Sequence, residues 1–212
     1  MQNPQTNICI VKIKKHLDKY KTYDIIHSQQ ENNTKLIKET QQMKTLIVVD
    51  MQNDFIDGAL GTPEAQAIVP NVKKKIEEYN TREDAIVYTR DTHFDNYLET
   101  SEGKHLPVKH CIMGAHGWQI ADGLEVSWGR YLNKPTFGWL GWKSFDFEDE
   151  DEVEIVGLCT DICVVSNALI LKAMFPNVKI TVDASCCAGV TPESHKAALT
   201  TMKMCQINVI GE

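Results

Sequence analysis

The sequence lacks several patterns that would place a protein in a large functional class. No GxGxxG or GxxxxGKS/T segment follows an expected strand, which disfavours a dinucleotide-binding or P-loop enzyme. No apolar run approaches the length of a membrane span, and no signal-peptide-like apolar segment opens the chain. We therefore expect no membrane partner.

The chain also has fewer positively than negatively charged residues. The 22 Lys and Arg are outnumbered by 29 Asp and Glu, giving a net charge of −7. Residues 1–42 carry seven Lys against four Asp and Glu, a net +3, so residues 43–212 carry −10. Binding to phosphates needs clustered positive charge, so we expect no nucleic-acid partner.

The cysteines do not form the pattern of a secreted disulfide framework. Their number, seven, is odd, and Cys186 and Cys187 are adjacent. Both features favour a reducing cytoplasm, with this pair packed near a strand end.

The first 42 residues differ in composition from the rest. They are rich in Lys, Gln, Asn and Thr, and only residues 8–13 are strand-like. We predict a polar, poorly ordered N-terminal extension over 1–42, or the product of an upstream start codon; a partner-binding arm is the less favoured alternative. With 212 residues and 42% hydrophobic content, the chain has enough material for one core, expected over 43–212.

Strands and helices are expected to alternate along residues 43–212. The expected strands are 45–50, 85–89, a segment near Glu125–Val126, 153–158, 179–182 and 207–210, and the expected helices are 68–79, 162–174 and 192–204. This order predicts a three-layer α/β/α fold with a mostly parallel sheet. Ligands of such sheets bind at the carboxyl ends of the strands, where Asp50, Asp91 and the loop before Cys163 fall.

Cys163 is a candidate nucleophile. It lies between an expected strand and an expected helix, and a helix N-terminus favours a thiolate. Asp50 and Lys134 could supply the base and the balancing charge that such a thiol needs. Each of the three residues also has a non-catalytic interpretation. Cys163 could be a buried structural cysteine, Asp50 a carboxylate that caps a turn, and Lys134 a solvated lysine.

A cluster of possible metal ligands lies between Asp50 and Lys134. Asp91, His93 and His110 offer a carboxylate and two imidazoles, which suit Zn²⁺, Fe²⁺ or Mn²⁺. His105 and His116 are weaker candidates, and Cys111 is interpreted as a small apolar residue. Solvent-exposed histidines are the alternative.

Five motifs occur in an order that resembles one family. They are Asp50-Met51-Gln52-Asn53-Asp54-Phe55, Thr89-Arg90-Asp91-Thr92-His93, His110-Cys111-Ile112-Met113-Gly114, Lys134-Pro135-Thr136-Phe137 and Cys159-Thr160-Asp161-Ile162-Cys163-Val164. Over residues 43–212 the sequence resembles the isochorismatase-like cysteine hydrolase superfamily and, within it, the nicotinamidases.

The resemblance implies a catalytic triad of Asp50 as base, Lys134 as its charged partner and Cys163 as nucleophile. It also implies a cis peptide bond between Leu158 and Cys159, a form that costs ~3 kcal/mol outside proline. The backbone N–H groups of Cys159 and Cys163 would then form an oxyanion hole.

The resemblance further implies a divalent metal ion, Zn²⁺ being favoured, held by Asp91, His93 and His110. Glu102 matches the fourth ligand better than Glu99. Phe55 matches an aromatic residue that lines the substrate pocket. Several nicotinamidases have a second aromatic residue three positions before the histidine that corresponds to His110, where this chain has Pro107. Trp118 and Phe137 are candidates to replace that aromatic residue, although packing is the more ordinary role of both.

The resemblance implies hydrolysis of nicotinamide to nicotinate and ammonia, feeding NAD salvage in the cytoplasm. The expected partner is a small-molecule amide, and the family implies a homo-oligomer. Two alternatives stay open: hydrolysis of another small amide or ureido compound, and a catalytically silent, oligomeric binding member.

Overall fold

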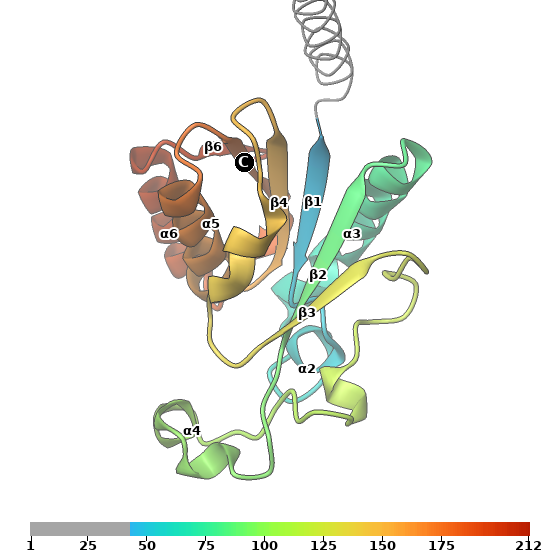
Figure 1. Ribbon diagram of the computed structural model, residues 1–212. Helices are drawn as coiled ribbons and strands as arrows, with labels where there is room; N and C mark the ends of the chain where they lie inside the picture. Colours follow the sequence, from blue (N-terminus) through green and yellow to red (C-terminus); the bar gives the residue numbers. More distant parts are fainter. Residues whose placement is uncertain (1–42) are drawn as a thin grey trace, which may run out of the picture. The chain divides into compact units, whose positions relative to one another are not determined.

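The computed structural model describes residues 43–212 (Figure 1). The expected extension over residues 1–42 lies outside the described residues. Among residues 43–212, no helix combines the length and the apolar character that crossing a bilayer requires.

The core of the fold is a six-stranded sheet in which every pair of neighbouring strands is parallel. The strands, in sheet order, are β3 (Arg130–Lys134), β2 (Ala85–Asp91), β1 (Lys44–Val49), β4 (Glu152–Leu158), β5 (Lys179–Ala188) and β6 (Asn208–Ile210). The central strand β1 ends in a continuous apolar run, residues 46–49, as expected of a strand covered on both faces. The predicted α/β class is confirmed.

Helices cover both faces of the sheet (Figure 1). One core cluster lies beneath α5 (Val165–Met174) and α6 (Pro192–Met204) and includes Ile155 and Leu171. The other lies beneath α3 (Pro63–Thr81) and includes Leu46 and Val72.

The two longest helices each begin at a threonine cap. At the start of α3, the Thr62 hydroxyl accepts a hydrogen bond from the Ala65 N–H at 3.0 Å, and Pro63 follows as the first helical residue. Thr191 caps α6 through a capping box with Ser194. Helix α6 has the predicted bounds, whereas α3 begins five residues before the predicted 68.

Two predicted elements were placed wrongly. The segment near Glu125–Val126, expected to be a strand, has no regular structure, and the edge strand β3 runs from Arg130 to Lys134 instead. Its composition is polar, so apolar content could not reveal it; stacking of Tyr131 on Tyr88, with ring centroids 5.0 Å apart, helps fix it beside β2. The helix predicted over 162–174 is divided into a π-helical turn η4 (Thr160–Val164) and α5.

The long segment after β2 is not wholly irregular. It contains η1 (Tyr97–Glu99), α4 (Ser101–His105) and η2 (His116–Trp118). Figure 1 shows this segment and the short helix α2 (Asn53–Ile56) beyond the carboxyl ends of β1 and β2. A further 3-10 segment, η3 (Leu140–Phe145), connects β3 towards β4.

Candidate active site and metal site

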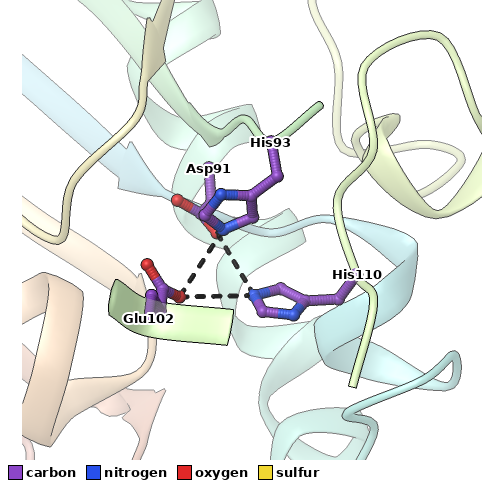
Figure 2. A group of neighbouring side chains, drawn as sticks. All are labelled: Asp91, His93, Glu102 and His110. Atoms are coloured by element: carbon purple, nitrogen blue, oxygen red, sulfur yellow. Dashed lines mark ion pairs between the residues drawn. The ribbon is translucent and has the colours of Figure 1, made fainter. Parts of the chain in front are cut away.

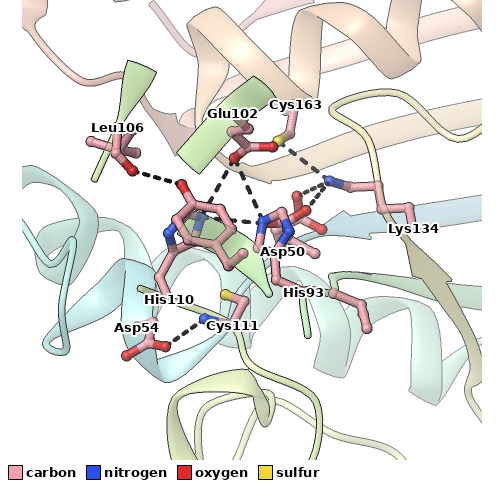
Figure 3. A network of polar contacts seen from close by, with 12 residues as sticks. Asp50, Asp54, His93, Glu102, Leu106, His110, Cys111, Lys134 and Cys163 are labelled. Carbon is pink, nitrogen blue, oxygen red and sulfur yellow. Dashed lines mark hydrogen bonds and ion pairs between the residues drawn. The ribbon is translucent and has the colours of Figure 1, made fainter. Parts of the chain in front are cut away.

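The structure brings the three predicted triad residues into direct contact. The Lys134 Nζ lies 2.6 Å from the Asp50 Oδ2 and 3.4 Å from the Cys163 Sγ (Figure 3). Asp50 and Lys134 are fully buried, and Cys163 is 5% exposed. The buried position of Lys134 contradicts the alternative that it is an ordinary solvated lysine.

Three strand ends carry this triad. Asp50 directly follows β1, Lys134 is the last residue of β3, and Cys163 lies in the turn after β4. Asp50 has a left-handed backbone with φ of 48°, and its carboxylate accepts a hydrogen bond from the Thr89 hydroxyl at 2.7 Å. Gly157 lets β4 approach this point: its φ is +117°, and a Cβ there would lie 2.1 Å from the Val49 carbonyl oxygen.

Burial favours the protonated form of the Cys163 thiol, against the preference for a thiolate at a helix N-terminus. Burial raises the pKa of Cys163 well above its usual range, the Asp50 carboxylate raises it further, and Lys134 opposes both. Burial also raises the pKa of Asp50, again against Lys134. For Lys134, burial lowers the pKa, but Asp50 and Cys163 outweigh it, so the amine stays charged. The arrangement suits proton transfer from the thiol to Asp50 during attack on a substrate.

The loop before the thiol has the backbone form that the resemblance implies, because the Leu158–Cys159 peptide bond is cis. The Cys159 carbonyl accepts hydrogen bonds from the N–H groups of Ile162 and Val164 at 3.1 and 3.0 Å. Side chains tie the same loop to α6: the Thr160 hydroxyl lies 2.8 Å from the His195 Nδ1.

Four possible metal ligands converge beside the triad. Each of four side chains contributes one ligand atom, and these four atoms lie within 4.8 Å of one another (Figure 2). The residues are Asp91, His93, Glu102 and His110. The His93 Nε2 is 2.8 Å from the Asp91 Oδ2 and 3.5 Å from the Glu102 Oε1. The His110 Nε2 is 3.5 and 3.7 Å from the same two oxygens. Ligands held at about 2.0–2.2 Å from one ion have separations of this order.

The donor set fits a divalent cation. The His110 Nδ1 lies 2.8 Å from the Val108 carbonyl oxygen, so Nδ1 carries the proton and Nε2 offers its lone pair to the cluster. The buried His93 Nε2 has no hydrogen bond of good geometry. Burial lowers the pKa of His93, but Asp91 and Glu102 outweigh it and raise that pKa to about 9. The cluster therefore attracts positive charge, whether a proton or a metal ion.

The other candidate ligands lie elsewhere. Glu99 is exposed and is absent from the cluster that contains Glu102. His105 places its Nδ1 2.7 Å from the Ser101 carbonyl oxygen, and His116 is exposed. Cys111 is fully buried, in agreement with its interpretation as a small apolar residue.

A cavity of about 810 Å³ is lined by Cys163 of the triad and by all four residues of the metal cluster. Its walls come from the loops after five neighbouring strands, β1 to β5. Phe55 lines it, as the resemblance implies, and so does Phe137, which is 45% exposed. Trp118 does not line it; its indole N–H donates to the Thr92 hydroxyl at 2.8 Å and Arg90 stacks on its ring, so packing is its role.

Sequence reasoning missed several residues that shape the site. Tyr97 is fully buried and packs against the rings of His93 and His110, with centroids 4.6 and 5.0 Å away. Gln52 and Asp54 hold the backbone beside two of the candidate ligands. Both stand inside the first motif, but nothing in a single sequence separates them from ordinary loop polar residues.

Known proteins are similar to this chain in sequence and in fold. The isochorismatase domain family matches residues 44–211. The chain belongs to this family. It is 26% identical to the nicotinamidase/pyrazinamidase of Mycobacterium tuberculosis, covering 79% of this chain and 98% of that one. It is 29% identical to an Arabidopsis thaliana protein named a probable inactive nicotinamidase, covering 74% and 87%.

Solved structures agree with this assignment. The crystal structure of the pyrazinamidase of Pyrococcus horikoshii in complex with zinc superposes with a TM-score of 0.67 at 26% identity, covering 80% of this chain and 99% of that one. Together with the contacts among Asp50, Lys134 and Cys163, these likenesses support an amide hydrolase.

Proposed function

We propose that the protein hydrolyses nicotinamide to nicotinate and ammonia, with a role in NAD salvage. The observation that carries this proposal is that Cys163, which Lys134 links to Asp50, and the four-residue cation cluster line one cavity. The partner would be a small-molecule amide, and a homo-oligomer in the cytoplasm is proposed as the setting.

In the proposed reaction, Asp50 takes the thiol proton as the Cys163 sulfur attacks the amide carbon. The carbonyl oxygen becomes an oxyanion, which the N–H groups of Cys159 and Cys163 would stabilise. The C–N bond breaks, Asp50 gives its proton to the leaving ammonia, and a thioester remains. Asp50 then takes a proton from water as the water oxygen attacks the thioester carbon. The C–S bond breaks, and Asp50 returns the proton to the departing sulfur, which leaves the acid and the free thiol. Lys134 stays protonated throughout.

Asp91, His93, Glu102 and His110 would hold the metal ion. When bound, a divalent ion there would supply a Lewis acid to which a ring nitrogen of the substrate can bind. Support comes from the converging ligand atoms and from the zinc complex of the P. horikoshii relative.

A larger amide is a second candidate substrate, favoured by the size of the cavity. Pockets of about 300–1,000 Å³ hold drug-sized ligands, whereas nicotinamide is a single ring with a carboxamide. The cavity has 810 Å³, and its wall includes exposed apolar side chains, Leu106 and Val190 among them.

Ammonia release from nicotinamide tests the proposal. We expect release by the purified protein, loss of it after chelation, and recovery with Zn²⁺. Cys163→Ala serves as the blank, and Cys205→Ala, at an exposed thiol, is the matched control. No release from nicotinamide but release from ring-alkylated nicotinamides would favour the larger amide. No release from any amide would favour a silent member, as the name of the A. thaliana relative suggests for that protein.

A further inference from the structure

Two polar side chains of the first motif hold the backbone of two candidate metal ligands. Gln52 and Asp54 flank the first residue of the short helix α2, and neither is one of the four possible metal ligands. Their contacts are with the main chain of Asp91 and of the residue after His110.

Gln52 is fully buried and uses its whole amide to hold two segments. Its Oε1 accepts the Asp91 N–H at 2.7 Å, and its Nε2 donates to the Asp91 carbonyl oxygen at 2.9 Å. The same Nε2 donates to the Trp118 carbonyl oxygen at 2.8 Å. Both backbone polar groups of Asp91 are therefore bound by one side chain, so the peptide planes on either side of this ligand have little freedom to rotate.

Asp54 performs the same task beside His110. Its Oδ2 accepts the N–H of Cys111 at 2.7 Å (Figure 3), where the backbone takes a left-handed φ of 46°. A Cβ on Gly117 would lie within about 2.2 Å of this carboxylate, so the carboxylate sits directly against the main chain of the loop. A hydrogen bond to an ionised acceptor is roughly twice as strong as a neutral one and can hold this uncommon conformation.

We propose that Gln52 and Asp54 are positioning residues, which preorganise Asp91 and His110 to bind a divalent cation. Hydrogen bonds outside the ligand shell fix the orientation of ligands, and their loss typically lowers metal affinity about 10–100-fold. The proposal rests on the metal site of the proposed function. It does not depend on which amide is hydrolysed.

A purely structural role is the competing explanation. Buried backbone N–H and C=O groups need partners in any loop, and the two side chains would then stabilise the fold without tuning the site. The two explanations differ in what they change: the affinity of the folded protein for metal, or only the stability of the metal-free protein.

The test compares Gln52→Met and Asp54→Asn with Asn53→Ala. Asn53 lies between them, and its side-chain N–H donates to the carbonyl oxygen of His116, which is not a cluster residue. The dissociation constant for Zn²⁺ is measured by competition with a chromophoric chelator, and the melting temperature of each metal-free protein is measured alongside. We expect the affinity for Zn²⁺ to fall about 10–100-fold in both positioning variants and to change less than about threefold in Asn53→Ala.

Equal affinity for Zn²⁺ in the folded Asp54→Asn variant and the wild type would overturn the inference, even if its melting temperature fell. An equal loss in Asn53→Ala would overturn it too. Should Gln52→Met not fold, Asp54→Asn decides alone, because Asp54 is only half-buried. A wild-type protein without affinity for Zn²⁺ would instead refute the metal site of the proposed function, a result distinct from the other two.

Discussion

At the scale of single residues, the buried Lys134 ammonium lies against the carboxylate of Asp50, which acts as the base in the proposed mechanism. It is the closest cation to the Asp50 carboxylate, at 2.6 Å, and it opposes the rise in pKa that burial imposes on Asp50. The proposed mechanism needs Asp50 ionised, so activity should fall as the pH falls through the pKa of this group.

Lys134→Met should therefore move the acid limb of the pH profile to higher pH. Without the ammonium, the pKa of Asp50 rises further, and the charged form is present only at higher pH. Loss of one partner of a buried ion pair should also reduce the free energy of unfolding by about 3–5 kcal/mol. The measurement is kcat/KM for amide hydrolysis against pH, with Lys143→Met, at an exposed lysine, as control. An acid limb that stays in place would contradict the role assigned to Lys134.

Two glutamates three residues apart offer a second comparison at this scale. Glu102 places its Oε1 3.5 Å from the His93 Nε2, whereas Glu99 is exposed and outside the cluster. Glu102→Ala should lower the zinc content of the purified protein and Glu99→Ala should change it little, as measured by elemental analysis. The reverse result would show that the ligand set is wrong.

At the scale of elements, helix α3 binds to the sheet through salt bridges as well as through its apolar face. Lys75 on α3 lies 2.7 Å from the Glu154 Oε1 on β4 and 3.0 Å from the Asp183 Oδ2 on β5. Burial raises the pKa of Asp183, but hydrogen bonds from Ser185 and Lys75 outweigh it, and the net shift is downward. Because the pKa of the Asp183 carboxyl is lower in the folded than in the unfolded protein, its ionised form stabilises the fold at pH values above the unfolded-state pKa. This stabilisation is lost as the pH falls through the folded-state pKa.

Asp183→Asn should remove that pH-dependent part of the stability. At pH 7 we expect the free energy of unfolding to fall by about 1–3 kcal/mol, the range for hydrogen bonds to charged groups. As the pH falls from the usual carboxyl pKa of about 3.9 through the lowered folded-state pKa, the wild type loses this contribution, so the difference between the two proteins should shrink. Urea titrations of both proteins at pH 7 and pH 3 measure this difference. A constant difference at both pH values would mean that Asp183 is not the titrating group.

The sequence predicts best the elements whose own residues carry a local signal for a strand or a helix. The apolar run of β1 and the capping box of α6 are local signals, and the structure has both elements where they were expected. Strand β3 gave no such signal, because an edge strand of polar composition is defined by its partner β2. The π-helical turn η4 depends likewise on the packing of Thr160 and its neighbours against α6.

At the scale of the whole molecule, the site gathers residues from loops that are far apart in sequence, and only part of that gathering was predictable. The rule that parallel strands end at one rim predicted that Asp50, Asp91 and Cys163 would meet. It could not predict the buried Lys134–Cys163 contact, because Lys134 belongs to the strand that was misplaced. It also missed Gln52 and Asp54, whose partners are backbone groups that no sequence pattern marks.

The described region should also fold without the residues that precede it. The described residues hold two core clusters, and the sheet begins at once: the Glu152 N–H donates to the Met43 carbonyl oxygen at 3.0 Å. The Met43 N–H donates to the Asp151 Oδ1 at 3.1 Å, so a new amino terminus there would face a carboxylate. We expect a chain that starts at Met43 to keep its free energy of unfolding within about 1 kcal/mol of the full chain. Urea unfolding of both chains measures this, and a loss of several kcal/mol or failure to fold would show that residues 1–42 contribute to the domain.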